Sequence, residues 1–183
     1  MQHKKILTQG GMVHYWINRK ENAADCIVFT HGVTADHTMF EQQVSYFYGN
    51  YTIILWDVPM HGLSRPYQGF SYHNTAEILR DILRQEKIEK IFLVGMSMGG
   101  YPSQHFASIY PDMVKGFIAL DTTLLGLTYY SKADLWWLKR AVLMAECFST
   151  HILKVSMAWS VSKRKYSFQK MMSMLEPLSK ADI

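Results

Sequence analysis

The sequence predicts an α/β fold: a doubly wound, mostly parallel sheet followed by a C-terminal helical segment. Three observations predict it. Short apolar runs recur as far as residue 120, helical patterns lie between them, and only helical patterns follow Thr123. Strands covered by helices on both faces form continuous apolar runs, and alternating strands and helices build a parallel sheet. We therefore expect an α/β core over residues 1–127 and a helical segment over residues 128–183.

Five segments have the composition of strands. They are residues 13–17 (VHYWI), 26–30 (CIVFT), 53–56 (IILW), 91–94 (IFLV) and 117–120 (FIAL). The last four are apolar without alternation, which is typical of strands buried on both faces.

The helices of the core follow from periodicity and from end signals. Residues 73–88 repeat apolar pairs at helical spacing, and Asn74 with Glu77 has the pattern of a capping box at the start. A second helix is expected after Ser97 through about Tyr110, because Pro111 favours a helix end just before it.

The C-terminal third is helical in pattern. Residues 131–149 predict one long helix, and at least one more is expected between Ile152 and Leu178. Residues 128–183 hold nine Lys/Arg and four Asp/Glu, a net charge of +5, whereas the rest holds ten and eleven, a net of −1. Such a basic region attracts acids, membranes or nucleic acid, or forms a solvated helix face. We favour the solvated face.

Composition excludes several classes of protein. No Lys/Arg run exceeds residues 163–165 and no nucleic-acid module is recognisable, so we expect no nucleic-acid partner. No apolar stretch reaches the roughly 18 residues of a membrane span, and the N-terminus lacks a secretion signal, which predicts a cytoplasmic protein. Cys26 and Cys147 fit no metal spacing, and we expect Cys26 in the core and no disulfide. Nucleotide-binding and metal motifs are absent from the sequence, so we expect no cofactor and no metal.

One short stretch predicts a nucleophile. Residues 95–100 (GMSMGG) follow an apolar strand and precede a helix, and they fit the pattern G-x-S-x-G. A serine at such a strand-to-helix corner has a strained backbone, and Gly95 and Gly99 leave room where side chains would clash. Ser97 is therefore the predicted nucleophile. The following helix directs its N-terminus to the same spot, so the Met98 amide faces a developing oxyanion.

Two further loops support this interpretation. Residues 30–34 (THGVT) and 56–64 (WDVPMHGLS) each follow a predicted strand, so three loops should converge at the carboxyl edge of one sheet, where open α/β sheets bind ligands. In the first loop the His-Gly pair allows a sharp turn, and the Val33 amide is the second predicted oxyanion donor.

Through these motifs the chain resembles the α/β-hydrolase family. The resemblance rests on His31-Gly32, on the D-x-P-x-H-G-x-S run that begins at Asp57, and on residues 95–100. It covers residues 1 to about 125, and residues 128–183 resemble the helical lid of family members. It implies a serine hydrolase that acts on an ester or related acyl bond of a small molecule. A cofactor-free haloperoxidase would use the same serine.

The sequence departs from the family's order of Ser, acid and His. No histidine occupies the family's base position, and we expect the base and the last strands of the usual fold to lie beyond Ile183. Asp121 follows the strand 117–120, where some members carry the acid; an Asp that caps the turn DTT is the alternative that we favour.

The absence of a histidine at the base position and of the last strands leaves alternatives open. The chain is a catalytically incomplete fragment of a longer hydrolase, a truncated gene product, or a non-catalytic module that binds a small ligand or a partner in the same pocket. The strand 117–120 would then be an uncovered sheet edge, which favours self-association.

Overall fold

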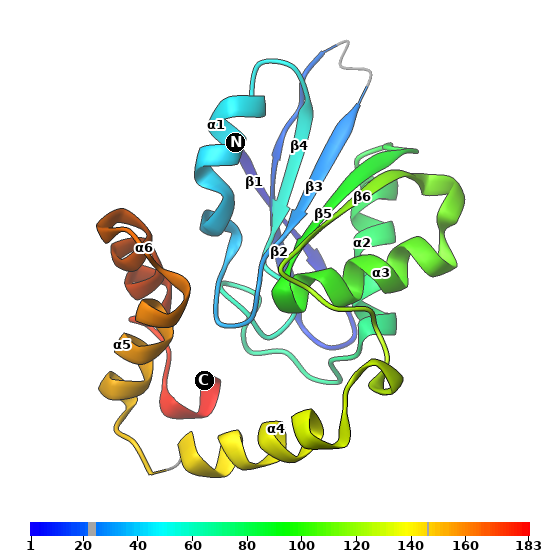
Figure 1. Cartoon of the computed structure of the whole chain (residues 1–183). Coiled ribbons are helices and arrows are strands. Elements are labelled where there is room, and N and C mark those ends of the chain that lie inside the picture. The colour runs from blue at the N-terminus through cyan, green and yellow to red at the C-terminus, as the bar shows by residue number, and fades with distance from the viewer. Residues whose placement is uncertain (22–24, 146) are drawn as a thin grey trace. The chain divides into compact units, whose positions relative to one another are not determined.

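A computed structural model describes residues 1–21, 25–145 and 147–183 (Figure 1). The chain divides into two compact units, residues 1–124 and 125–183. The first unit holds all six strands, and the second holds the three helices α4 to α6.

The sheet has six strands in the order β1-β2-β4-β3-β5-β6. The strands are β1 (Gln2–Leu7), β2 (Met12–Asn18), β3 (Cys26–Thr30), β4 (Thr52–Trp56), β5 (Ile91–Met96) and β6 (Val114–Leu120). The neighbours β4, β3, β5 and β6 run parallel, whereas β1 and β2 join antiparallel at one edge. The predicted mostly parallel sheet is confirmed.

Strand β1 was not predicted from the sequence. Its residues, QHKKIL, include two lysines and a histidine, and its burial pattern is mostly exposed. An edge strand of this kind contributes few residues to the core, so it leaves no apolar run to detect.

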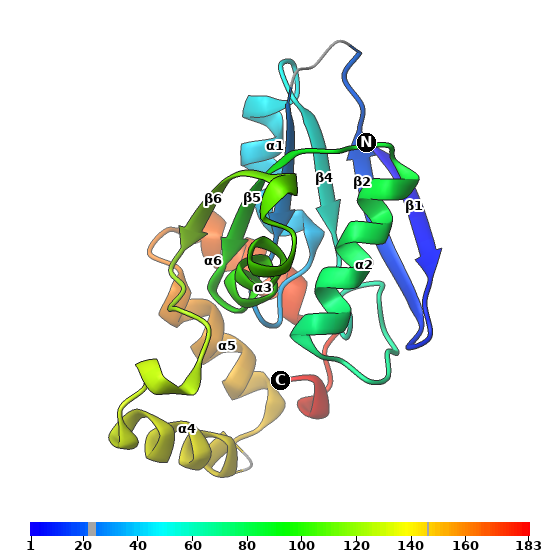
Figure 2. The ribbon, with the colours of Figure 1, turned by 90° about the vertical axis from the view of Figure 1, so that its right-hand side faces the viewer.

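Helices cover both faces of the sheet, as expected for a doubly wound domain (Figures 1 and 2). Helix α1 (Glu41–Phe47) lies on one face, and α2 (Tyr72–Gln85) and α3 (Gly100–Ile109) lie on the other. Strand β3 alternates between the two cores, because Val28 packs in the cluster of α2 and α3 while Ile27 and Phe29 pack in the cluster of α1. All five of its residues are buried.

The predicted capping box on α2 is wrong. The N-cap is Ser71, whose hydroxyl accepts a hydrogen bond from the amide of Asn74 at 3.0 Å. Glu77 instead pairs with Arg80 and accepts a hydrogen bond from Tyr110 on the loop after α3. The error arose because Ser71 and Asn74 both suit a cap, and only the backbone before Tyr72 decides between them.

A buried carboxylate ties α2 to the antiparallel edge. Glu86 is 3% exposed and accepts hydrogen bonds from Lys4 on β1 (2.8 Å), Tyr15 on β2 (2.6 Å) and Arg19 (2.9 Å). Burial alone would raise the pKa of Glu86, but these donors outweigh it and hold the pKa below its usual range. The carboxylate therefore stays ionised and joins three elements far apart in sequence.

The second unit consists of helices in its described residues. These are α4 (Lys132–Ala145), α5 (Thr150–Val161) and α6 (Lys165–Leu175), so α4 is shorter than the predicted helix, whose residue 146 lies outside the described residues. Helices α5 and α6 pack together, and the Lys154 ammonium donates to the Glu176 carbonyl at 2.7 Å. That this unit is a lid stays a prediction. None of the described helices has both the length and the apolar character that a membrane crossing requires.

Both cysteines are free thiols. Cys26 is buried at the start of β3, as expected, and Cys147 is exposed.

Candidate functional site

Three loops meet at the carboxyl ends of the parallel strands, as the sequence predicts. The loop after β3 contacts the loop after β5, since a Cβ on Gly32 would lie 3.5 Å from the Ser97 Cβ. It also contacts the loop after β4, because the Val58 amide donates to the His31 Nε2 at 3.0 Å. Open α/β sheets bind ligands at this edge.

Ser97 has the backbone of a strand-to-helix corner. Strand β5 ends at Met96, Ser97 has φ +50°, and a short 3₁₀ turn over Ser97–Gly99 leads into α3. A non-glycine residue at positive φ is strained, and such strain concentrates at functional sites. The side chain of Ser97 is partly exposed.

The two glycines around Ser97 permit close backbone contacts. A Cβ on Gly95 would lie 2.7 Å from the Gly99 carbonyl oxygen. A Cβ on Gly99 would overlap the carbonyl oxygens of Thr30 and His31. The G-x-S-x-G pattern is thus required here so that β5, the start of α3 and the end of β3 can approach one another.

The two predicted oxyanion donors come from the 3₁₀ turn after β5 and from the loop after β3. Met98 is the second residue of the 3₁₀ turn, and its side chain packs against the core cluster under α2 and α3. Val33 follows Gly32, is 50% exposed, and precedes Thr34, whose φ is +60°. Met98 directly follows Ser97, and Val33 directly follows Gly32, which contacts Ser97. The role of both residues as oxyanion donors stays a prediction.

His31 is a neutral structural residue. It is fully buried, its Nε2 accepts from the Val58 amide at 3.0 Å, and its Nδ1 therefore carries the proton and donates to the Gly32 carbonyl at 2.7 Å. Burial and the neighbouring His61 lower the pKa of His31 to about 4. With both ring nitrogens occupied, His31 supports the loop and is not available as a base.

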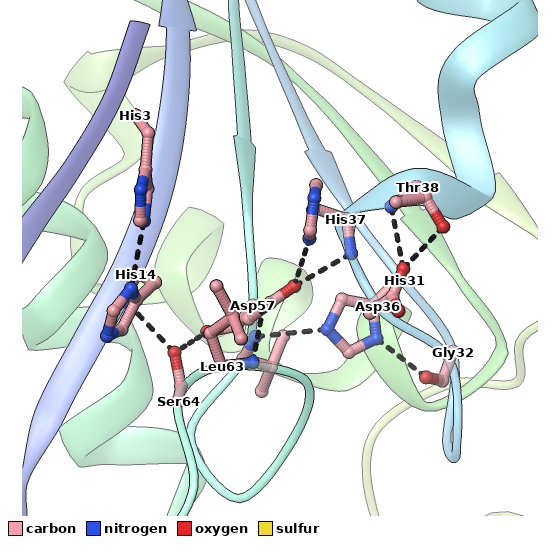
Figure 3. Close-up of polar contacts among 11 residues, drawn as sticks. His3, His14, His31, Gly32, Asp36, His37, Thr38, Asp57, Leu63 and Ser64 are labelled. Carbon is pink, nitrogen blue, oxygen red and sulfur yellow. Dashed lines mark hydrogen bonds and ion pairs between the residues drawn. The ribbon is translucent and has the colours of Figure 1, made fainter. Parts of the chain in front are cut away.

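Asp57 joins two of the three loops (Figure 3). Its carboxylate is fully buried; Oδ1 accepts from the amide and the Nδ1 of His37, each at 2.8 Å, and Oδ2 accepts from the Leu63 amide at 2.7 Å. Burial alone would raise the pKa of Asp57, but the hydrogen bonds and charge of His37, with the Leu63 amide, hold it below its usual range. Ser64 extends the network, since its hydroxyl donates to the Asp57 carbonyl at 2.8 Å and accepts from the His14 amide at 2.9 Å.

The pairing of His37 with Asp57 was missed from the sequence. In the sequence Asp57 stands out only as part of a motif, and no pattern singles out His37. Twenty residues separate them, and no periodicity connects them; only the approach of the loops after β3 and β4 brings them together.

The other histidines of residues 1–124 form contacts elsewhere. His61 contacts the Pro59 carbonyl, His3 contacts His14 at 2.9 Å, and His73 contacts His105 at 3.5 Å. Within residues 1–21, 25–145 and 147–183, no hydrogen bond joins Ser97 to a histidine. Nor does that part of the chain contain a group of three or more His, Cys, Asp or Glu side chains placed to hold a metal ion.

Asp121 lies beside Ser97 in the register of the sheet. Met96 and Leu120 are register partners at the ends of β5 and β6, and Ser97 and Asp121 directly follow them. Their backbones share the left-handed region, with φ of +50° and +47°. We find no hydrogen bond of the Asp121 carboxylate among the described residues, so the favoured capping role gains no support, and its position beside Ser97 suits the acid interpretation.

The comparisons with known proteins agree with this geometry. Residues 25–156 match the sequence model of the family described as alpha/beta hydrolase fold. The chain is 36% identical over 100 residues to 3-oxoadipate enol-lactonase 1 of Acinetobacter baylyi, covering 54% of this chain and 37% of the relative. It is 30% identical over 106 residues to 2-(acetamidomethylene)succinate hydrolase of Mesorhizobium japonicum, covering 57% and 38%. The matched region spans less than half the length of these relatives.

Solved structures share the fold. A hydrolase from Pseudomonas aeruginosa PA01 superposes with a TM-score of 0.78 at 15% identity, covering 98% of this chain and 69% of that one. A thermophilic esterase from Thermogutta terrifontis gives a TM-score of 0.71 at 21% identity, covering 96% and 66%.

The corner geometry predicts the effect of a methyl group at Gly99. Gly99→Ala is expected to lower the free energy of unfolding by about 3 kcal/mol, because the methyl overlaps backbone carbonyls that cannot rotate away. Gly49→Ala is the control, since no atom lies within 4 Å of its added Cβ, and it should change stability by less than about 1 kcal/mol. Urea unfolding measures both, and equal effects of the two substitutions would contradict the packing described.

The burial of His31 predicts a pH dependence of stability. The folded pKa of about 4 lies below the unfolded value of 6.5, so the unfolded chain binds a proton first as pH falls. Stability should therefore decrease from about pH 6.5 towards pH 4, by roughly 2 kcal/mol between pH 7 and pH 5 from this residue alone. Urea unfolding at both pH values should show a smaller pH effect for His31→Gln than for the exposed control His73→Gln. A loss of stability that is the same in both variants would show that His31 is not its source.

Proposed function

Because the chain belongs to the alpha/beta hydrolase fold family, we propose that it carries the nucleophile of a serine hydrolase, with Ser97 attacking a carboxylic ester or lactone. The observation that carries the proposal is the left-handed backbone of Ser97 at the carboxyl end of β5, between two glycines that tolerate no Cβ. Curated relatives include an enol-lactonase and a succinate-derivative hydrolase, which supports a small acyl substrate.

In the proposed reaction, the Ser97 Oγ forms a bond to the carbonyl carbon while its proton passes to a base. The amides of Val33 and Met98 stabilise the oxyanion of the tetrahedral intermediate. The intermediate expels the alcohol, which takes up the proton, and water then releases the acid from the acyl-serine.

The base is the missing component. His31, His37 and His61 lie near the loops but are engaged by the Gly32 carbonyl, the Asp57 carboxylate and the Pro59 carbonyl. We propose that the base comes from outside residues 1–183, as a further segment or a partner chain, with Asp121 placed to orient it. The same engagement of the histidines favours a second candidate, a non-catalytic module that binds a small ligand at this edge.

A fluorophosphonate probe distinguishes the two. We expect the folded chain to gain one phosphonyl adduct, read by intact mass, because strain and the oxyanion loops present the Ser97 hydroxyl even without its base. The adduct should be absent in Ser97→Ala and present in Ser45→Ala, whose serine lies on α1. A folded chain that stays unlabelled would show that Ser97 is not activated within residues 1–183, and it would favour the binding module.

We further propose that the free edge of β6 pairs with a second copy of the chain. Strand β6 is the last strand of the sheet, and Ile118 and Leu120 on it are 52% and 38% exposed. Exposed apolar edge strands pair with other chains unless charges prevent it.

Light scattering after gel filtration tests whether the edge of β6 pairs with a second copy of the chain. We expect a concentration-dependent dimer of the parent chain. Ile118→Lys should raise the dissociation constant of this dimer by at least about tenfold, because it places a charge on the pairing surface. Leu7→Lys makes the same change at a 76% exposed position on β1, the opposite edge, and should leave the dimer intact. A monomeric parent chain, or equal effects of both variants, would exclude this edge.

A further inference from the structure

The loop that carries Val33 is held at both of its ends by the loop after β4 (Figure 3). At the first end, the His31 ring links the Gly32 carbonyl (2.7 Å) to the Val58 amide (3.0 Å). At the second end, the His37 backbone amide and Nδ1 both donate to the Asp57 carboxylate at 2.8 Å. Residues 32–36 span the distance between these two attachments.

Within the span, Thr34 and Ala35 are buried, but backbone hydrogen bonds are few. The Ala35 amide donates to the Gly32 carbonyl at 3.3 Å, a long hydrogen bond, and Thr34 has the strained φ of +60°. The Asp36 side chain binds the residues that follow the span, since its carboxylate accepts a hydrogen bond from the Thr38 amide at 2.8 Å. The two attachments are thus the hydrogen bonds that fix this span, which contains Val33, to the loop after β4.

The second attachment is protected from water. The Asp57 carboxylate is fully buried, and the ring of Trp16 stacks on the His37 ring with 3.4 Å between centroids and 11° between planes. A charge-assisted hydrogen bond in such a setting is stronger than one at the surface. The stacking and the hydrogen bond both act on the His37 ring, so they must be separated experimentally.

We infer that His37 is a positioning residue: its hydrogen bond to Asp57 holds residues 32–36 so that the Val33 amide stays beside Ser97. This rests on the proposed function of Ser97, because positioning matters to chemistry only if the serine reacts. His37 contacts no reacting atom itself. It acts through the backbone, at a distance of four residues from Val33.

Two substitutions separate the hydrogen bond from the stacking. His37→Phe keeps a ring for Trp16 and removes the Nδ1 donor. His37→Asn loses the ring and keeps an N–H donor near the position of Nδ1. Val44→Ala is the matched control, because it opens a cavity in the core under α1 and removes no hydrogen bond of residues 32–37.

Hydrogen–deuterium exchange of residues 32–36 is the first readout, since it does not depend on activity. His37→Phe should raise exchange there about tenfold, and His37→Asn should stay within about threefold of the parent chain. Val44→Ala should raise exchange in β3, β4 and α1 without a selective effect on residues 32–36. The inference is overturned if His37→Phe leaves the segment unchanged, if Val44→Ala loosens it equally, or if His37→Asn is the more damaging variant.

The rate of phosphonylation of Ser97 is the second readout. His37→Phe should slow it about tenfold and His37→Asn should largely restore it, because the oxyanion of the phosphonyl transfer uses the same amides. A parent chain that is never labelled has no activated serine and favours the non-catalytic module, while exchange still decides whether His37 holds the loop. A labelled parent with an unchanged rate in His37→Phe rejects the positioning role alone.

Discussion

The arrangement of the site depends on one buried carboxylate. Asp57 directly follows β4 and accepts hydrogen bonds from the loop after β3 through Oδ1 and from its own loop through Oδ2. A fully buried carboxylate is costly unless donors surround it, so the loops gain stability only when both sets of donors are in place. The geometry of the two loops is therefore coupled, and neither is determined by its own residues alone.

This coupling extends from the antiparallel part of the sheet to Ser97. The His14 amide on β2 donates to Ser64, Ser64 donates to the Asp57 carbonyl, and Asp57 holds His37. The loop that ends at His37 begins at Gly32, which lies against Ser97. Polar contacts under the site thus connect β2, the neighbour of the edge strand β1, with the centre of the sheet. The glycines at positions 95 and 99 determine how closely the backbones around Ser97 approach.

The sequence was sufficient for the features that local patterns encode. Continuous apolar runs located β3, β4 and β5 because most of their residues on both faces are buried. The same kind of run also located β6, but there the expected burial on both faces is wrong, since the residues of this edge strand are partly or fully exposed. G-x-S-x-G located the corner because its glycines lie in close backbone contacts. Strand β1 was missed because an edge strand needs no apolar run. The pair of His37 and Asp57 was missed because only tertiary structure brings two polar residues twenty positions apart into contact.

The placement of Ser97 and its proposed activation as a nucleophile depend on different groups. Placement depends on backbone strain at Ser97, on glycine contacts and on the Asp57 network, all within residues 1–124. Activation needs a base, and the histidines near the loops are already engaged in supporting that placement. Because Ser97 and Asp121 follow paired residues of neighbouring strands, the sheet itself fixes where an activating group would have to be held. A base bound at this edge would lie near both Ser97 and Asp121, which follow paired residues of β5 and β6. The strained backbone of Ser97 is already present in the fold without that base.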